Sequence, residues 1–481
     1  LTNPTLPAFI MAIPIKLFGP SVTAVRFWSP LVGAGTVVVV YDLGRRLWRW
    51  EVGVIAAVLL AGSHFHLHYS RLGMTNVWDP LLALLALGAL ALAWENESGR
   101  RYWLLAGLLV GLNAYVFTGS HLLPFMLVSL LALAVFFDKA RLLRLWRHLL
   151  AAAAFALIVA LPQLLHYQAN PTIFMERANA LGIFSGQTNW LAQEAARTGL
   201  SQGEILQEQV WRGLLAFNYG RDHSPSFRPF APLLSFGPAV LFLLGLLLAV
   251  TRQRDWGNWT LAVWVVVTAV FGGAFLLEPP TSHRLVIATP ALSLLAAIAL
   301  VEIGDWVKQI WEKPKSTPRA QTSGFFFSEF SEFSVSSAAL ILIIIAALFT
   351  LNDVVYYFGR YPAQSQFADR NTEIADKMAD YLNTLAPSEW TVYFFGPPSM
   401  YVGFPTLPFL ASEFQDGVNL FDVTLDDPEF PATDGPNLAF IFLPERAKEL
   451  AEVQQRWGNG RAQSISGAYA SPLFTVYEVK P

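Results

Sequence analysis

Apolar residues along this chain occur in long blocks, without the alternating or 3.6-residue patterns of soluble proteins. A block of about 20 apolar residues is long enough to cross the hydrocarbon of a bilayer as a helix. We therefore expect a mainly α polytopic membrane protein with about ten spans. The spans are expected near residues 22–43, 52–69, 78–94, 102–118, 121–137, 149–167, 231–250, 258–277, 285–306 and 337–358.

Lysine and arginine are concentrated in every second loop between these spans. The basic loops contain Arg45, Arg46, Arg49, Arg100, Arg101, Lys139, Arg141, Arg144, Arg147, Arg252, Arg254, Lys308, Lys313, Lys315 and Arg319. Cytoplasmic loops carry an excess of basic residues, so these loops are predicted to be cytoplasmic. The segments predicted on the outer side are residues 1–21, 68–80, 168–230, 278–284 and everything after 358.

The pattern divides the chain into a juxtamembrane segment at residues 1–21, a transmembrane domain at 22–360 and a last domain at 361–481. The short run 5–18 is expected to lie in the membrane interface, because it is too short to cross. Residues 168–230 form an outer loop with helices on the membrane face. Residues 307–335 form a cytoplasmic linker that includes a biased Phe/Ser/Glu run, to which we assign no chemistry.

Residues 361–481 have a different pattern from the rest of the chain. The runs "ADRNTEIADKMADYLNTL" and "ERAKELAEVQQRWG" have the periodicity of amphipathic helices, and "EWTVYFFG", "LAFIFLP" and "FTVYEVK" resemble strands. Strands that alternate with helices predict a small α/β domain, here on the extracytoplasmic side.

The composition agrees with a membrane protein and removes several kinds of chemistry. Of the residues, 54% are hydrophobic and only 14% are charged. The net charge is −3, so nothing suggests a nucleic-acid partner. The chain has no cysteine, which excludes disulfides, thiolate nucleophiles and cysteine-ligated metals.

The outer loop "HYSRLGMTNVWDP", residues 68–80, contains Arg71 and Asp79 between two apolar spans. One interpretation is that the two side chains pair with each other or reach the lipid headgroups, and that Asp79 caps the helix that begins near Pro80. The other is that they line an outward-facing cavity. The structural and functional roles are compatible.

Three segments resemble the glycosyltransferase 39-like, protein-mannosyltransferase-type membrane enzymes. In residues 3–48 the matching positions are Pro4, Leu6, Lys16, Leu17, Phe18, Gly19, Arg26, Leu43, Gly44, Arg45, Arg46 and Leu47. The stretch "HYSRLGMTNVWDPLLALLAL" is similar to the next outer loop of that family, where a Ser-Arg and a later Asp precede a span. "SHRLVIATPAL" also resembles a family pattern. The match is good over roughly residues 3–140.

The resemblance implies a GT-C architecture with its catalytic face on the outer side, in the plasma membrane. Such enzymes transfer a hexosyl or pentosyl group from a polyprenyl-phosphate sugar donor to an acceptor on a glycan, lipid or protein. The donor is a membrane lipid, and the resemblance leaves open a divalent metal. This chemistry needs a carboxylate to accept the acceptor proton, cations for the departing phosphate, and a groove for the prenyl chain.

The resemblance also predicts which residues act. The main carboxylate of the family lies in the first outer loop, after an initial span, so we expect it upstream of this chain. Asp79 matches the family's second acidic position and is the catalytic candidate. Glu278 is a secondary acidic candidate for substrate binding, whereas Asp42 lies beside Arg45 and Arg46 and is more simply explained by pairing.

Arg71 and Arg284 are the candidates for binding the donor phosphate. Both are outer-side arginines in short loops, and a guanidinium pairs with phosphate in a bidentate manner. Contact with lipid headgroups is the competing explanation. His121 and His283 each lie at the outer end of a predicted span, and both are candidates for contact with the donor sugar.

The sequence "HFHLH" places His64, His66 and His68 close together. A metal site there is conceivable, but polar residues at the end of a span explain the pattern more simply, and we assign no metal ligands. Two other functions stay open. A flippase of lipid-linked sugars would be expected to show internal repeats or charges at mid-span, neither of which is evident. A non-catalytic membrane scaffold is the other alternative.

Overall fold

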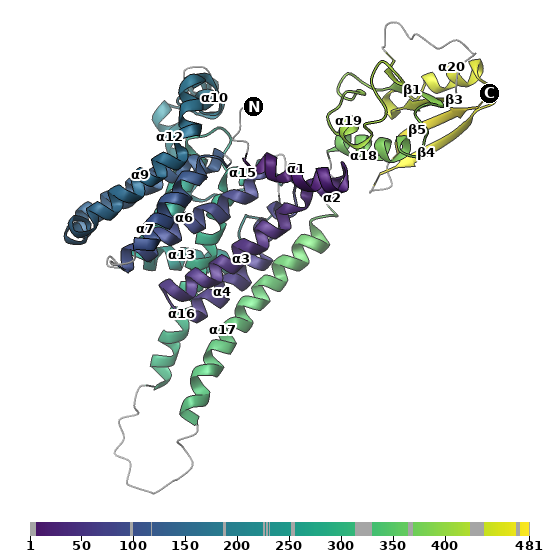
Figure 1. Cartoon of the computed structure of the whole chain (residues 1–481). Helices are drawn as coiled ribbons and strands as arrows, with labels where there is room; N and C mark the ends of the chain where they lie inside the picture. The colour runs from purple at the N-terminus through teal and green to yellow at the C-terminus, as the bar shows by residue number, and fades with distance from the viewer. Residues whose placement is uncertain are drawn as a thin grey trace, which may run out of the picture. The chain divides into compact units, whose positions relative to one another are not determined.

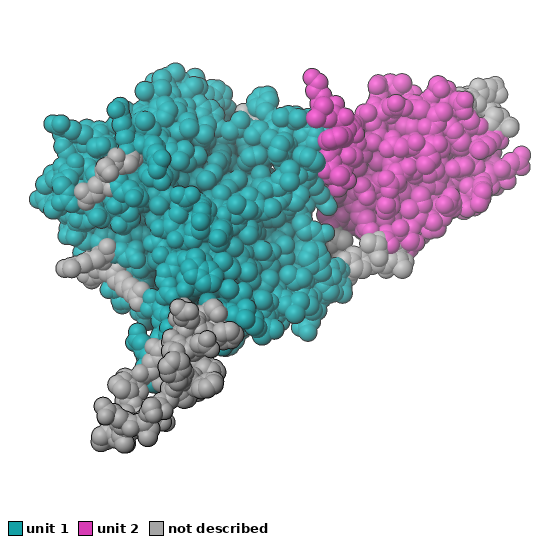
Figure 2. Space-filling model, turned by 60° about the horizontal axis from the view of Figure 1, so that its bottom comes forward, with its two compact units in different colours: residues 1–14, 25–363 teal, residues 15–24, 364–481 magenta. Residues whose placement is uncertain are grey.

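The computed structural model places most of the chain. It describes residues 6–480 except 97–99, 117, 186–188, 225–226, 228, 230, 252–254, 313–329, 364–368, 424–436 and 468–471. The chain forms two compact units, coloured separately in Figure 2. The first comprises Leu1–Pro14 and Val25–Ala363, and the second comprises Ile15–Ala24 and Gln364–Pro481. The domain boundaries drawn from the sequence, at residues 21 and 360, stay predictions.

Helices form the whole first unit. The helices α1 (Leu6–Phe18) and α2 (Val22–Arg26) come first in the chain and belong partly to the second unit. In the first unit they are followed by α3 (Trp28–Leu47), α4 (Trp50–Gly62), α5 (His64–Tyr69), η1 (Thr75–Val77), α6 (Trp78–Glu95), α7 (Arg100–Asn113), η2 (Thr118–Leu122), α8 (Leu123–Phe137) and α9 (Lys139–Ala169). Its later elements are α10 (Pro171–Leu181), α11 (Trp190–Thr198), α12 (Gln202–Leu214), α13 (Phe236–Thr251), α14 (Trp256–Ala269), η3 (Val270–Ala274), α15 (Ser282–Leu285), η4 (Val286–Ala288), α16 (Thr289–Glu312), α17 (Phe330–Val355) and η5 (Tyr356–Arg360).

Each expected span coincides with one of these helices. Within the described residues, 7 helices are long and apolar enough to cross a membrane. The other three expected spans correspond to α4, α7 and α13, which are shorter, with 13, 14 and 16 residues. The mainly helical, membrane-spanning fold class is thus confirmed, and the protein is an integral membrane protein.

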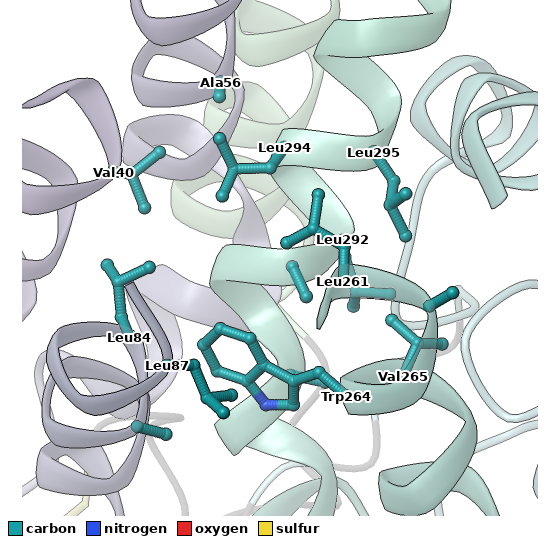
Figure 3. Close-up of a cluster of buried hydrophobic side chains, with 14 of the residues drawn as sticks. Val40, Ala56, Leu84, Leu87, Leu261, Trp264, Val265, Leu292, Leu294 and Leu295 are labelled. Carbon is teal, nitrogen blue, oxygen red and sulfur yellow. The ribbon is translucent and has the colours of Figure 1, made fainter. Parts of the chain in front are cut away.

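The centre of the first unit is built around α16. In the most apolar stretch of α16, 89% of the residues are buried inside the protein. The corresponding share is 83% for α14 together with η3 and 72% for α6 together with η1. Leu292, Leu294 and Leu295 of α16 meet Leu261, Trp264 and Val265 of α14 in one buried cluster (Figure 3). Helices that are apolar on all sides need such a central position or a lipid environment.

The peripheral helices expose their apolar side chains. Only 11% of the apolar window of α9 and 17% of that of α17 are buried in the protein. The exposed residues on α9 are Leu143, Trp146, Leu150, Leu157, Ile158, Leu161, Leu164 and Leu165. An apolar surface of this extent is unfavourable in water and suits contact with lipid chains.

Small residues allow the helices to approach closely. The Cβ position of Gly44 in α3 would lie 2.7 Å from the Cα of Gly53 in α4. A Cβ on Gly245 in α13 would overlap the carbonyl oxygen of Leu295 in α16. Between membrane helices, where lipid is as apolar as leucine, such close backbone packing is a main source of association.

Non-α backbone gathers near one end of the helical unit. The 3₁₀ turns η1, η2 and η4 and the π-helical turn η3 lie beside the ends of α6, α8, α14 and α16. Figure 1 shows α10, α12 and α15 at this upper end, with the far ends of α16 and α17 extending the opposite way. Helices α11 and α12 confirm that the predicted outer loop contains helices.

The linker expected at 307–335 is only partly described. Residues 307–312 complete α16, residues 313–329 lie outside the described residues, and the biased run from Phe330 onward begins α17.

The second unit contains the predicted α/β domain. Its elements are α18 (Arg370–Leu382), β1 (Trp390–Phe395), α19 (Thr406–Leu410), β2 (Leu420–Asp422), β3 (Asn437–Phe442), α20 (Glu449–Arg456), β4 (Arg461–Ser466) and β5 (Pro472–Val479), with a 3₁₀ turn at Pro444–Arg446. The five-stranded sheet has the order β2-β1-β3-β5-β4. β1 pairs in parallel with β2 and β3, whereas β5 is antiparallel to both β3 and β4.

Aromatic side chains of this sheet and of the residue that follows α20 fill a core. Phe395, Phe440, Phe442, Trp457 and Tyr477 form one buried cluster. The three strands and two helices expected from the sequence are present, and β2, β4 and α19 are additional. The two added strands have few apolar residues: β2 has three residues in all and β4 is largely exposed.

We expect that Gly245→Ala lowers the free energy of unfolding by about 1–3 kcal/mol, because the added methyl group overlaps the Leu295 carbonyl oxygen and must separate α13 from α16. Gly35→Ala in α3 is the matched control, because the nearest atom to its Cβ position is 4.0 Å away. Reversible unfolding in mixed micelles measures both variants. Equal stability of the two variants would contradict close packing of α13 on α16.

Candidate functional site

Asp79 is one of the most deeply buried polar residues of the helical unit. It lies in the first turn of α6 and is 1% exposed. The expectation that it caps this helix is wrong, because the N-cap residue is Val77 and no side chain caps the terminus. The preceding turn η1 continues directly into α6, so Asp79 falls inside the helix. Its carboxylate still lies at the end of the helix dipole that favours negative charge.

The turn η2 packs against this carboxylate. A Cβ built on Gly119 would overlap Oδ2 of Asp79, so only a glycine permits this approach. The same turn contains His121, whose ring centroid lies 6.2 Å from that of Tyr167 in α9. The structure therefore brings Asp79 and the turn that contains His121 together, although they are 40 residues apart in the sequence.

Arg284 folds back over the turn that contains Glu278. Its Nη1 donates a hydrogen bond of 2.9 Å to the carbonyl oxygen of Leu277. Glu278 itself is exposed and has a positive φ of 55°. A positive φ is uncommon for a residue other than glycine and often marks a functional segment. The hydrogen bond from Arg284 to Leu277 and the backbone conformation of Glu278 together define the shape of the turn 277–284.

His283 links this segment to the start of α6. Asn76 in η1, three residues before Asp79, donates through Nδ2 to the carbonyl oxygen of His283 at 2.8 Å. On the other side, the Cβ position of Gly272 in η3 is 3.1 Å from Leu122 in η2 and 3.5 Å from the carbonyl oxygen of Arg284. The start of α6 with η1, the turn η2 and the short helix α15 therefore lie close to one another.

Arg71 has different neighbours. Its side chain is exposed, and its guanidinium carbon lies 5.6 Å from the ring centroid of Tyr357 and 5.0 Å from that of Phe358. A cation over two aromatic faces is held by cation–π attraction. The hypothesis that Arg71 and Asp79 face one cavity stays a prediction.

A buried polar network that the sequence analysis did not identify supports the convergent segments. Asp222, which is 5% exposed, accepts hydrogen bonds from the backbone N–H of Ser224 at 3.0 Å and of Ser282 at 2.7 Å. Its other oxygen accepts the Ser282 hydroxyl at 2.6 Å. The Ser282 hydroxyl also lies 2.7 Å from the hydroxyl of Tyr69 in α5. The presence of an aspartate inside an outer loop was visible, but its burial was not.

The three histidines of "HFHLH" contact three different elements. Nε2 of His64 lies 3.0 Å from the Pro232 carbonyl oxygen, and its Nδ1 lies 3.2 Å from the Asp353 carboxylate in α17. Nε2 of His66 lies 3.2 Å from the Gly33 carbonyl oxygen. The ring of His68 stacks on Phe227 with centroids 4.1 Å apart. Among the described residues, no three His, Asp or Glu side chains gather in a way that could hold a metal ion.

Comparison with known proteins connects this geometry to a family. Residues 2–166 match the model of the family described as dolichyl-phosphate-mannose-protein mannosyltransferase. This segment includes Asp79, Gly119 and His121. The resemblance inferred from the sequence is thereby confirmed over the first third of the chain.

The curated relatives are arabinosyl transferases. The undecaprenyl phosphate-alpha-4-amino-4-deoxy-L-arabinose arabinosyl transferase of Pseudomonas paraeruginosa (strain DSM 24068 / PA7) is 31% identical over 164 residues, which are 33% of this chain and 28% of the relative. The corresponding enzyme of Pseudomonas aeruginosa (strain UCBPP-PA14) is 30% identical over 164 residues, with the same shares of the two chains. The match thus spans less than a third of the length of these relatives.

Solved structures extend the similarity to the whole chain. ArnT from Cupriavidus metallidurans in the apo state superposes with a TM-score of 0.54 at 15% identity, over 100% of this chain and 89% of that chain. ArnT from the same organism bound to undecaprenyl phosphate gives a TM-score of 0.53 at 15% identity and the same coverage. The chain has a GT-C fold. The architecture expected from the sequence is therefore confirmed.

We expect His64→Ala to lower the free energy of unfolding by roughly 2 kcal/mol, because it removes the imidazole whose Nδ1 lies 3.2 Å from the Asp353 carboxyl group and leaves that buried polar group without its neighbour. Asp353→Leu added to His64→Ala should recover most of that loss, because the second change removes the buried polar group that has lost its neighbour. Chemical unfolding in detergent measures both variants. If the double variant is less stable than His64→Ala, the two side chains do not stabilise the protein through their contact.

Proposed function

We propose that this protein is an integral membrane glycosyltransferase that moves a hexosyl or pentosyl group from a polyprenyl-phosphate carrier to an acceptor hydroxyl. The observation that carries the proposal is the position of Asp79. This carboxylate lies in the segment that matches the mannosyltransferase family and packs against η2. It is three residues after Asn76, which donates a hydrogen bond to the carbonyl oxygen of His283. The GT-C fold supports the same class of reaction.

Each convergent segment supplies one requirement of the reaction. In the proposal, Asp79 orients the sugar of the donor or the acceptor hydroxyl through its carboxylate. Arg284 binds the phosphate, since a guanidinium can donate two parallel hydrogen bonds to phosphate oxygens. A positive charge there also stabilises the phosphate as the glycosidic bond breaks. His121 and His283 contact the donor sugar, and Glu278 is a further substrate-binding candidate.

Arg71 has a separate part in the proposal. It is exposed beside two aromatic rings of η5, which hold the guanidinium but leave its edge able to bind an anion. We propose that it contacts the phosphate or the headgroups around it. No step of the proposed reaction is assigned to a metal ion.

The relatives narrow the donor class. The similar arabinosyl transferases are named for an undecaprenyl-phosphate sugar, and one similar ArnT structure is bound to undecaprenyl phosphate. We therefore propose undecaprenyl phosphate as the carrier of the donor sugar. The exposed apolar faces of α9 and α17 would keep the protein in the bilayer where such a carrier resides. A glycan, a lipid or a protein would supply the acceptor hydroxyl.

We also propose that the protein lies in the plasma membrane with the site and the α/β domain on the extracytoplasmic side. The support is the distribution of basic residues. The loops at one end of the spans contain groups such as Arg45, Arg46 and Arg49, whereas the short loops of the other set contain little beyond Arg71 and Arg284.

The proposal is tested by assaying transfer from a radiolabelled undecaprenyl-phosphate sugar in proteoliposomes, using the protein expressed from its complete coding sequence. Asp79→Asn should fold normally and lose transfer by at least about tenfold, or ~1.4 kcal/mol of transition-state stabilisation. Gly119→Ala should have a similar effect, because its methyl group displaces the Asp79 carboxylate.

Gly203→Ala is the matched control, because the nearest atom to its Cβ position is 3.9 Å away and it lies in α12. Transfer by Asp79→Asn at the parental rate would remove Asp79 from the site. Movement of the intact lipid-linked sugar across the bilayer without any transfer would replace the proposed enzyme by a flippase.

Membrane orientation is tested by cysteine labelling, for which the absence of native cysteine gives a clean background. We expect Gln202→Cys to react with a membrane-impermeant maleimide in intact cells and Arg100→Cys to react only after the cells are opened, because Gln202 lies in the predicted outer loop 168–230 and Arg100 lies in a basic loop that is predicted to be cytoplasmic. The reverse labelling pattern would overturn the orientation.

A further inference from the structure

We infer that Asp222 is a positioning residue that holds His283 and Arg284 in place for the donor phosphate. The inference rests on the proposed function, which assigns these two residues to substrate binding. Asp222 comes from the long loop between α12 and α13, about 60 residues before the segment that it holds. It is outside the segment that matches the mannosyltransferase family.

The carboxylate of Asp222 binds the residue directly before His283. Ser282 donates to it twice, through its backbone N–H at 2.7 Å and through its hydroxyl at 2.6 Å. Ser282 is fully buried and Asp222 is 5% exposed, so water does not compete strongly for these bonds. Hydrogen bonds to an ionised acceptor are shorter and stronger than neutral ones, which suits a fixed position.

The neighbours of Asp222 hold the same segment on both sides. The backbone N–H of His223 donates to the carbonyl oxygen of Pro280 at 2.9 Å. The hydroxyl of Ser224 lies 3.1 Å from Nδ1 of His283. Residues 222–224 therefore run beside residues 280–283, and each of the three contributes one contact or more.

The position of Arg284 depends on the contacts between residues 222–224 and residues 280–283. α15 has only four residues, Ser282–Leu285, so its own backbone hydrogen bonds cannot fix the start of the segment. Asp222 fixes Ser282, the first residue of α15, and the Arg284 guanidinium then reaches the Leu277 carbonyl oxygen at 2.9 Å. Loss of the Asp222 acceptor would release the first residue of α15, which is two residues before Arg284.

A second anchor joins the network to the rest of the bundle. The hydroxyl of Tyr69 at the end of α5 lies 2.7 Å from the Ser282 hydroxyl, and Tyr69 is completely buried. Asn76 binds the carbonyl oxygen of His283 from η1. The segment is therefore tied to α5, to η1 and to the loop that contains Asp222, and Asp222 bonds Ser282 through both of its oxygens.

Asn and Ala at position 222 separate the acceptor geometry from the charge. Asn keeps one oxygen that can accept the two backbone N–H groups, whereas Ala leaves both of these buried donors without their acceptor. We expect Asp222→Ala to raise the donor KM at least about tenfold with a smaller change in kcat. Asp222→Asn should stay within about threefold of the parent.

A double-variant cycle with Arg284→Ala separates positioning from a general loss of structure. If Asp222 acts through Arg284, the KM effect of Asp222→Ala should largely disappear in the Arg284→Ala background. Additive effects of the two changes on KM would overturn the inference. If Asp222→Ala does not fold, Ser282→Ala takes its place in the cycle, with an expected KM rise of about threefold because it removes only the hydroxyl bond.

Asp255→Ala is the matched control. Asp255 accepts a backbone N–H from Asn258 at 3.1 Å at the start of α14, so its loss removes a similar bond at the end of α14 opposite to the one that continues into η3. It should lower thermal stability and leave the donor KM unchanged. A KM rise in Asp255→Ala equal to that in Asp222→Ala would show that the effect is not local, and would overturn the inference.

Hydrogen exchange keeps this test independent of the proposed activity. In Asp222→Ala, peptides that cover residues 280–285 should exchange faster, because the Ser282 N–H has lost its acceptor. Unchanged exchange in these peptides would overturn the role of Asp222. Absence of transfer by the parent protein would instead remove the proposed function alone, since the exchange result does not depend on turnover.

Discussion

The constraint on which the rest of the structure depends is the lack of water in the hydrocarbon of the bilayer. Each backbone N–H and C=O there must be bonded within its own segment, which favours uninterrupted helices. The 3₁₀ and π-helical turns η1, η2, η3 and η4 therefore occur near helix ends, where other polar groups can satisfy them. The candidate site is built from these turns, because their irregular backbone lets side chains and carbonyl groups face one another.

Close helix packing positions these turns. α16 lies at the centre of the helical unit, and most of its apolar stretch is buried inside the protein. Gly245 lets the backbone of α13 approach the backbone of α16 directly. The same use of glycine recurs where Gly119 meets the Asp79 carboxylate. Small residues thus have two effects: they hold the bundle together, and they let a carboxylate lie beside a turn from another part of the chain.

The fold was largely predictable from the sequence, whereas the site was only partly so. Membrane spans follow from length and hydropathy alone, which explains why each expected span coincides with a helix. Asp79 was identified, but its capping role was wrong, because η1 continues into α6 and the N-cap residue is Val77. Asp222 was missed since a lone aspartate in a polar loop gives no sign of burial. The edge strand β4 was missed because its exposed residues do not alternate between apolar and polar.

The sequence by itself determined the membrane class, the positions of the helices, the α/β pattern of the last domain and the polar residues available for chemistry. These depend on local properties: the length of apolar runs, their periodicity and the placement of charge. Only the tertiary structure decided which polar residues meet. Asn76 reaches the backbone of His283 from 207 residues away, Asp222 reaches Ser282 across 60, and His64 contacts Asp353 across nearly 290. Such contacts depend on how buried helices pack against one another, and no local pattern encodes that arrangement.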